Sequence, residues 1–457
     1  MYRQMKVVLI STYELGRQPF GLASPAAWLR ARGDEVACLD LSREPFREEI
    51  IRGASLIAFY VPMHTATRLA VELLPAVRRI NSAAHICFYG LYAPMNESWL
   101  RKLGVQTILG GEFEEGLQNL ASRIAAGHGA EKQIEPVISL ARQKFRLPDR
   151  SGLVPLEKYA RLSLPGGGRR TVGYTEASRG CKHLCRHCPI VPVYNGVFRI
   201  VERDVVLADV RQQVAAGAAH ITFGDPDFFN GIGHAIPLVE ALHVEFPRLT
   251  YDVTIKIEHL LRYSQHLRTL RDTGCLFVTS AVESVDDDVL EKLDKHHTHA
   301  DFLAVVRRFR EIGLTLQPTF VPFTPWTTLD GYLDLLDCLR ENDLVENVAP
   351  IQLAIRLLIP AGSRLLKLPD FRALAGPFDE RAMVHPWKHP DPRVDALCEE
   401  LQRVVHSGEK MNQPRARFFQ RIEEAARRAA GLEANESHQP ILVSRAAIPY
   451  LTEPWYC

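Results

Sequence analysis

The chain has 457 residues, of which 46% are hydrophobic and 24% are charged, and its net charge at pH 7 is +1. This length predicts two or three domains, with cores large enough to form without disulfides. The charge balance lacks the basic excess that is usual in nucleic-acid-binding proteins, so no nucleic-acid partner is expected. The sequence contains neither a membrane-spanning apolar segment nor a signal peptide, so we expect a cytoplasmic protein without a membrane partner.

Strand and helix patterns alternate over residues 1–130. Amphipathic helical patterns, such as those at 66–80 and 112–127, lie between short apolar runs. Apolar runs that alternate with helices indicate a parallel sheet covered on both faces. We therefore predict an α/β domain with a flavodoxin-like, doubly wound parallel sheet, which binds ligands at the carboxyl ends of its strands. Its strands are expected at 6–12, 35–41, 55–61, 85–90 and 105–111.

A second α/β rhythm begins after a linker predicted over residues 131–170. Over 171–360 it gives six βα units, which are too few for a closed eight-fold barrel and predict a partial (β/α)6 TIM barrel. Residues 361–457 lose the rhythm and are expected to form a mostly helical C-terminal extension, with helices near 391–406 and 413–430. The barrel strands are expected at 171–177, 220–225, 251–258, 276–283, 315–323 and 348–359, and its helices at 203–217, 232–246, 259–273, 285–312 and 327–341.

Three of the nine cysteines fall in the loop after the first barrel strand, with the spacing Cys181-x-x-x-Cys185-x-x-Cys188. A structural zinc site usually takes four ligands, and the remaining cysteines are isolated, although His183 and His187 lie in the same loop. A disulfide would leave one cysteine over. Three thiolates on one loop suit a 4Fe–4S cluster with one iron open to a ligand. The loop lies at the face where barrels place their chemistry.

This CxxxCxxC spacing resembles that of the radical S-adenosylmethionine (SAM) superfamily, in which the open iron binds SAM. The resemblance covers about residues 170–360 and implies Cys181, Cys185 and Cys188 as metal ligands, with a 4Fe–4S cluster and SAM as cofactors. His187 stands where the family often has an aromatic residue before the third cysteine.

The same resemblance implies a SAM site at the ends of the second, third and fourth barrel strands. Each polar residue there is also explained as a solvated cap, but together and in order they reinforce one another. The amino group of SAM is expected at Gly224, Asp225 and Pro226 in "FGDPD". The ribose or carboxylate is expected at Lys256 and Glu258 in "KIEH", and the fourth-strand motif at Glu283 and Ser284 in "AVES".

A flavodoxin-like domain before such a barrel resembles the cobalamin-binding class of the superfamily. That resemblance implies a corrin over the strand ends. The Asp-x-His-x-x-Gly signature of cobalt ligation is absent from residues 1–150, and many radical SAM members also lack it. His64 is a candidate for contact with the corrin, or equally for capping the helix that follows. The alternative is a domain that recognises substrate or serves as a scaffold.

The chain ends in "AAIPYLTEPWYC", which resembles a group of radical SAM proteins whose tails carry a Cys/Sec-Ala-Glu-Pro motif (the CUAEP/CCAEP-tail group). The motif itself is missing, and one hypothesis is a reading frame closed at a selenocysteine codon. Cys457 is then a candidate catalytic thiol that binds a soft element or carries substrate. The other interpretation is that Trp455 and Tyr456 anchor the tail and Cys457 has no role.

The sequence thus predicts a radical SAM enzyme. With cobalamin bound, the expected reaction is methyl transfer to a small-molecule substrate or natural-product intermediate, with electrons from a flavodoxin- or ferredoxin-type donor. One alternative is the transfer of another SAM fragment to an arsenic, selenium or thiol acceptor. An alternative of another class is a non-catalytic iron–sulfur binding or sensor protein.

Overall fold

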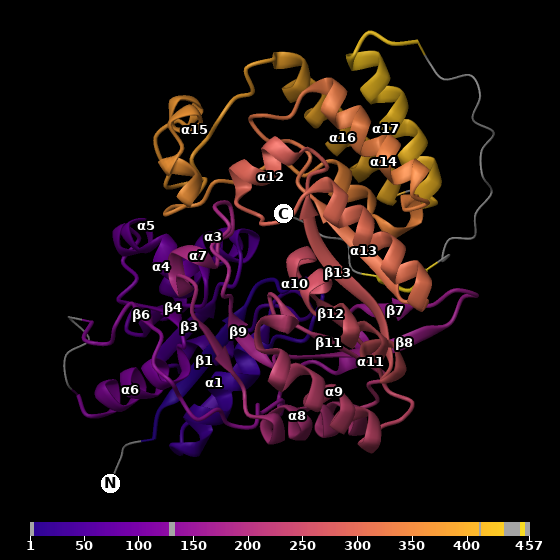
Figure 1. Ribbon diagram of the computed structural model, residues 1–457. Coiled ribbons are helices and arrows are strands. Elements are labelled where there is room, and N and C mark those ends of the chain that lie inside the picture. The colour runs from indigo at the N-terminus through magenta and orange to yellow at the C-terminus, as the bar shows by residue number, and fades with distance from the viewer. Residues whose placement is uncertain (1–3, 128–132, 411–412, 434–447, 453–457) are drawn as a thin grey trace.

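A computed structural model of the protein describes residues 4–127, 133–410, 413–433 and 448–452. An N-terminal α/β domain packs beside a curled parallel sheet that has its own helices. The C-terminal part of the chain forms further helices (Figure 1). The predicted fold class is therefore confirmed: a doubly wound parallel sheet, a half-barrel and a helical C-terminal extension.

The N-terminal sheet has the strand order β2-β1-β3-β4-β5-β6, and all its pairs are parallel. Five strands match the five predicted apolar runs, and the short sixth strand lies within the predicted linker. Both faces are apolar, because parallel strands covered by helices on both sides bury every side chain. The strands are β1 (Lys6–Ser11), β2 (Glu35–Asp40), β3 (Leu56–Tyr60), β4 (His85–Tyr89), β5 (Thr107–Gly111) and β6 (Ile138–Ser139).

Helices cover both faces of this sheet. On one face, α1 (Phe20–Ala31) and α6 (Glu114–Ala125) pack against each other and the strands. On the other, α3 (His64–Ile80) buries Ala66, Ala70, Leu74 and Val77, a spacing that places them on one side of the helix. The short helices α2 (Glu48–Arg52), α4 (Tyr92–Met95) and α5 (Glu97–Lys102) complete the domain.

The second sheet has the order β14-β13-β12-β11-β8-β7-β15, in which β8 to β14 are parallel and β7 is antiparallel to its neighbours. Its parallel strands are β8 (Arg169–Thr175), β11 (His220–Phe223), β12 (Thr250–Thr254), β13 (Cys275–Glu283) and β14 (Thr315–Phe320). The edge strands are β7 (Arg161–Ser163) and β15 (Tyr450–Leu451). The covering helices are α8 (Arg203–Ala215), α9 (Ile232–Glu245), α10 (Ile257–Arg262), α11 (Leu267–Asp272), α12 (Asp287–Leu293), α13 (His299–Ile312) and α14 (Leu329–Glu341).

Three predicted barrel elements are wrong in detail. The single helix expected over 259–273 is two helices, α10 and α11, with a 3-10 turn at Ser264–His266 between them. The strand expected over 348–359 is reduced to one bridge between Phe323 and Arg356, because a 3-10 helix begins at Pro350 and takes up Pro350–Leu353. The single helix expected over 285–312 is two helices, α12 and α13. Asp294 and His296, both with positive φ, end the first helix, and Thr298 caps the second.

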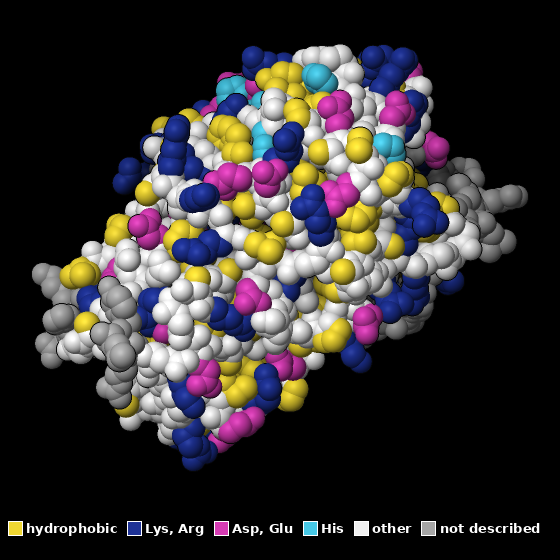
Figure 2. All heavy atoms as spheres, turned by 90° about the horizontal axis from the view of Figure 1, so that it is seen from below, with side chains coloured by type: hydrophobic (Ala, Val, Ile, Leu, Met, Phe, Trp, Pro, Cys, Tyr) yellow, Lys and Arg dark blue, Asp and Glu magenta, His cyan; other side chains and the backbone are white. Residues whose placement is uncertain are grey.

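The C-terminal extension contains α15 (Pro369–Leu374), α16 (Pro392–Lys410) and α17 (Arg415–Ala429). Helices α16 and α17 pack on each other and on the half-barrel core, and α17 contacts α14 (Figure 1). Helix α15 packs against α12, where Phe371 lies in one apolar cluster with Val289 and Leu293. Among the described helices, none is long and apolar enough to cross a membrane. On the face shown in Figure 2, basic and acidic side chains are interspersed, in keeping with the net charge of +1.

Candidate active site

The three-cysteine loop is framed by two short antiparallel strands, β9 (Ser178–Gly180) and β10 (Phe198–Ile200). Because β9 directly follows β8, the loop lies at the carboxyl end of the half-barrel. Cys185 is buried, and Cys181 and Cys188 are half-buried. The one-turn helix α7 (Val191–Tyr194) follows the third cysteine.

The spacing of the thiols favours a cluster over a single ion. A zinc ion with Zn–S bonds of about 2.3 Å would hold its sulfurs about 3.8 Å apart. Among the described residues, Cys181, Cys185 and Cys188 do not form a group with ligand atoms within 4.8 Å of one another. Burial and the neighbouring thiols raise the pKa of Cys188 to about 12, so the apo loop holds thiols that must lose protons to bind metal.

Both histidines of the loop bond to residues at other strand ends, although His187 Nδ1 has no hydrogen-bond partner among the described residues. His187 Nε2 lies 3.1 Å from Glu283 Oε1, and Lys295 Nζ lies 3.3 Å from the same oxygen. Lys295 and His187 hold the pKa of Glu283 at about 2, despite its burial. Glu283 thus remains ionised beside the cysteine loop.

His183 lies in a second polar network. Its Nε2 is 3.2 Å from Asp227 Oδ2, and its Nδ1 accepts from Lys256 Nζ at 3.2 Å. Lys256 also donates to Glu258 at 3.2 Å. His183, Asp227 and His259 lie close enough to hold a metal ion. However, the ammonium of Lys256 fixes the proton of His183 on the nitrogen that would ligate it, so this network orients the loop instead.

The "FGDPD" stretch shapes the end of β11. Asp225 accepts from Ser178 Oγ at 2.5 Å and from Ala177 N at 2.9 Å, so its buried side chain holds β9. Gly224 is close to Tyr174, since a Cβ at 224 would lie 1.8 Å from the Tyr174 hydroxyl. Pro226 is half-buried between them and Asp227.

The remaining predicted site residues lie elsewhere. Ser284 Oγ accepts from Asp286 N at 3.0 Å in the turn before α12. His64 Nε2 donates to the carbonyl of Ala382 at 2.7 Å, so it ties the N-terminal domain to the C-terminal extension. Cys457 lies outside the described residues.

A buried charged cluster, which sequence reasoning missed, joins the loop to the N-terminal domain. Arg179 in β9 contacts Glu112 at 3.4 Å and Glu114 at 2.6 Å, both just after β5, and Glu176 at 2.7 Å. Tyr194 donates to Glu112 at 3.2 Å. The carboxyl ends of the two sheets therefore face each other across the cysteine loop. The sequence signal for this cluster was the motif "GGEFEE", which places acidic residues directly after a predicted strand.

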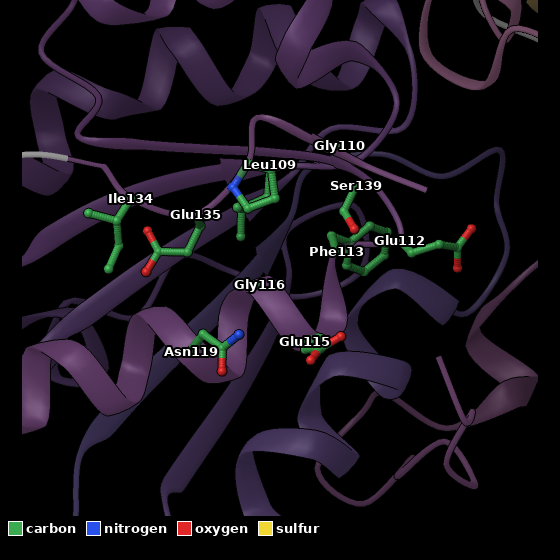
Figure 3. A pocket seen from close by; sticks show the side chains of 11 residues that line it. Leu109, Gly110, Glu112, Phe113, Glu115, Gly116, Asn119, Ile134, Glu135 and Ser139 are labelled. Atoms are coloured by element: carbon green, nitrogen blue, oxygen red, sulfur yellow. The ribbon is translucent and has the colours of Figure 1, made fainter. Parts of the chain in front are cut away.

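A cavity of about 410 Å³ opens at the carboxyl end of β5 (Figure 3). Small residues, including Gly110, Gly116 and Ser139, line it together with Phe113. Glu112 also lines it, so the cavity adjoins the charged cluster between the domains.

Fold and site together define an α/β protein whose half-barrel presents a three-cysteine loop at its carboxyl end. Residues 175–336, which lie in the half-barrel, match the family model of the radical SAM superfamily.

Two curated relatives share part of the chain. The hopanoid C-3 methylase of Methylococcus capsulatus is 23% identical over 328 residues, which are 68% of this chain and 62% of the methylase. The ribosomal protein uS12 methylthiotransferase RimO of Geobacter sulfurreducens is 24% identical over 178 residues, 37% of this chain and 39% of RimO. The chain thus spans less than two thirds of the length of either relative.

Two solved structures share the fold. The cobalamin-dependent SAM radical enzyme OxsB, with aqua-cobalamin bound, aligns with a TM-score of 0.66 at 15% identity, over 89% of this chain and 67% of OxsB. The methyltransferase TsrM from Kitasatospora setae, with cobalamin and a 4Fe–4S cluster bound, gives 0.58 at 19% identity, over 74% of each chain. The likeness to OxsB spans both α/β domains.

Proposed function

We propose that the protein is a cobalamin-dependent radical SAM methyltransferase that acts on a small molecule. One observation carries the proposal: the three-thiol loop lies between the carboxyl ends of two parallel sheets, joined there by Arg179, Glu112 and Glu114. Ligands of open α/β sheets bind at such strand ends, so two cofactors bound on the two sheets would face each other.

The thiols of Cys181, Cys185 and Cys188 suit a 4Fe–4S cluster with one open iron. For SAM, the site offers a carboxylate and an ammonium beside the loop, Glu283 and Lys256. Glu283 bonds its neighbours through Oε1, and Oε2 accepts no hydrogen bond from a described residue. Lys256 is 6% exposed and faces the loop through His183. These groups match the ribose hydroxyls and carboxylate of SAM in charge and hydrogen-bonding capacity.

The N-terminal strand ends also fit a large polar ring such as cobalamin. Ser11 Oγ, at the carboxyl end of β1, is buried without a hydrogen-bond partner, although such groups normally have one. Gly110 and Gly116 line the cavity at the end of β5, and a Cβ at 110 would lie 2.5 Å from the ring of Pro94. The fold likeness to OxsB and TsrM supports the same cofactor.

The protein residues have positioning roles in this proposal. When bound, the cluster and SAM supply a carbon radical, and cobalamin supplies a transferable methyl group. Asp225 fixes β9 and thereby the start of the cysteine loop, while His187 and Lys295 keep Glu283 ionised. Packing of α7 against β5 and α4 excludes water between the two sheets. A flavodoxin- or ferredoxin-type protein would supply electrons, and neither nucleic acid nor membrane takes part.

The test is anaerobic reconstitution with iron, sulfide and hydroxocobalamin, followed by an assay for SAM cleavage products. We expect an iron–sulfur absorption band that is lost when Cys181, Cys185 and Cys188 become Ala, corrin bands retained through gel filtration, and 5′-deoxyadenosine or S-adenosylhomocysteine from the intact protein alone. A cluster without any SAM cleavage product would favour an iron–sulfur sensor. Failure to retain the corrin would leave a radical SAM enzyme without methyl transfer from cobalamin.

A second candidate function is transfer of another SAM fragment to a thiophilic acceptor held by Cys457. It is favoured by β15, which pairs antiparallel with β7 and so runs parallel to β8, toward the site. Thr452, the last described residue, lies level with Thr171 on β8. Under this candidate, Cys457→Ala abolishes transfer to arsenite or selenite and leaves SAM cleavage unchanged.

A further inference from the structure

The loop after β1 holds an acid, Glu14, and a base, Arg17, that form no direct ion pair. Glu14 is 5% exposed, its Oε2 is buried, and its carboxylate bonds to no described residue. Arg17, three residues on, bonds through its guanidinium to no described residue, and its Nε is buried. Its guanidinium lies over the ring of Tyr174 in β8, with 4.8 Å between the guanidinium carbon and the ring centre. Buried charges without partners are costly, so this arrangement indicates a ligand that completes both.

The groups around this loop come from both domains. Glu176, at the end of β8, raises the pKa of Glu14 by electrostatic repulsion after burial itself, so the two carboxyls are neighbours. Burial raises the pKa of Tyr60, at the end of β3, and the nearby Glu14, Glu176 and Tyr174 raise it further. The hydroxyls of Tyr60 and Tyr174 have no hydrogen-bond partner among the described residues. The ring of Tyr174 thus lies against the Arg17 guanidinium, and Glu14 lies near Glu176 and Tyr60.

The other guanidinium groups nearby are already committed. Arg179 pairs with Glu112, Glu114 and Glu176, and Arg150 pairs with Asp209 at 2.8 Å. Glu14 and Arg17 therefore form no direct ion pair with a described residue, although Arg17 and Arg150 lower the pKa of Glu14 through space, against the effect of burial. The loop lies next to the SAM motif, since the hydroxyl of Tyr174 contacts Gly224.

We infer that this loop binds a zwitterionic substrate, with its ammonium on Glu14 and Glu176 and its acid group on Arg17. The substrate is then an amino acid, or a small molecule that ends as one. Rings such as Tyr60 and Tyr174 attract ammonium groups through their faces. The inference rests on the proposed function, because it places the substrate beside the SAM motif, between the two sheets.

The probe is a ¹⁴C-labelled mixture of the twenty protein amino acids, offered to the reconstituted full-length protein by equilibrium dialysis. We expect retention that N-acetylated or carboxy-amidated amino acids do not compete away, because each lacks one of the two charges. Glu14→Gln and Arg17→Met should each lower retention tenfold or more. Two control variants, Glu35→Gln and Arg308→Met, each remove one exposed charge of the same sign elsewhere on the surface. Both should retain as much labelled amino acid as the wild type.

Equal retention by the wild type and by both Glu14→Gln and Arg17→Met would overturn the inference, as would equal competition by the blocked amino acids. Glu176→Gln serves as a second variant should Glu14→Gln fail to fold, judged by circular dichroism and cluster absorbance. Dialysis requires no turnover. Retained amino acids without SAM cleavage would therefore refute the proposed function alone, and SAM cleavage without retention would refute this inference alone.

Discussion

Two glutamates on one arginine show how local hydrogen bonding decides a charge state. Glu114 accepts from Ser24 at 2.6 Å and from Gln143 at 2.8 Å besides its contact with Arg179, and its pKa is lowered although it is fully buried. Glu112 has a longer contact with Arg179 and one bond from Tyr194, and burial raises its pKa to about 7. The charged junction between the domains therefore changes protonation near neutral pH.

This difference predicts a pH dependence of stability. The folded-state pKa of Glu112, about 7, exceeds its unfolded value of 4.5, so its contribution is complete below pH 4.5 and is lost as the pH rises through 7. We expect this carboxyl to lower the free energy of unfolding by about 1–3 kcal/mol between pH 5 and 8. In urea unfolding series at pH 5 and at pH 8, Glu112→Gln should lack this part of the decrease in the free energy of unfolding. An unchanged slope would contradict the assignment.

The buried pair Glu283 and Lys295 predicts a strong single-variant effect. Lys295 is 3% exposed, and Lys295→Met leaves His187 as the one described residue that bonds to the Glu283 carboxylate. Removing one partner of a buried ion pair costs about 3–5 kcal/mol, because the other charge stays buried. We expect that loss in the free energy of unfolding of the apo protein, measured with urea.

The matched control for this pair is the double variant Lys295→Met with Glu283→Gln. It removes both charges, so it should regain most of the lost stability. Equal destabilisation of the single and double variants would show that packing around the Lys295 stem, rather than its charge, is responsible.

At the scale of elements, local sequence patterns were sufficient to predict those strands and motifs whose structure depends mainly on neighbouring residues. The five apolar runs of the N-terminal sheet and the three cysteines could be predicted because each signal lies within a few residues. The hairpin of β7 and β8 was not predicted, although Gly166 and Gly167 with positive φ form its turn. Residues 161–163 are too short to show a period of two, and their pairing depends on β8.

The contacts of the site depend on residues that are distant in sequence. Asp225 bonds to Ser178, and Glu283 bonds to His187, across separations of 47 and 96 residues. The sequence therefore predicted which strand ends carry polar groups and did not predict which of these bond to one another. Arg17 and Arg179 were missed because their roles arise only where the two sheets meet.

Helix α12 supports the cysteine loop through its last carbonyls. Arg186 Nη1 donates to the carbonyls of Glu291 at 2.8 Å and Lys292 at 3.1 Å, and a cation at this end also interacts favourably with the helix dipole. Arg186→Met should leave the fold intact and loosen the loop. We expect a twofold or greater fall in iron retained after reconstitution and gel filtration. The exposed Arg308→Met is the control, and equal iron in both variants would exclude this role.

At the scale of the whole molecule, the C-terminal extension connects parts that lie far apart in the chain. Lys102 of α5 pairs with Glu380 at 2.6 Å, and His64 donates to Ala382. The same extension holds the cysteine loop, where Ser363 donates to the carbonyl of Arg186 at 3.1 Å. Because it contacts both the N-terminal domain and the loop, the extension restricts their relative movement.

Arg179 predicts how strongly the two α/β domains are coupled. Its guanidinium is the shared partner of Glu112 and Glu114 from one domain and Glu176 from the other, and all these contacts are largely buried. Arg179→Met would leave three carboxylates without a cation, which we expect to cost about 3 kcal/mol or more. The cost falls on the junction, so the domains should then unfold in two separate steps.

Urea unfolding followed by far-UV circular dichroism tests this coupling, with the exposed Arg211→Met as a control because its partner Glu245 lies in the same domain. The wild type and Arg211→Met should unfold in one transition, and Arg179→Met should show an earlier step of partial amplitude. Lowering the pH should bring the early unfolding step of Arg179→Met closer to the main transition. Protonated carboxyls carry no charge, so the loss of the guanidinium then costs less stability. A single transition in Arg179→Met at pH 8 would show that apolar packing across the junction, not this cluster, holds the two sheets face to face.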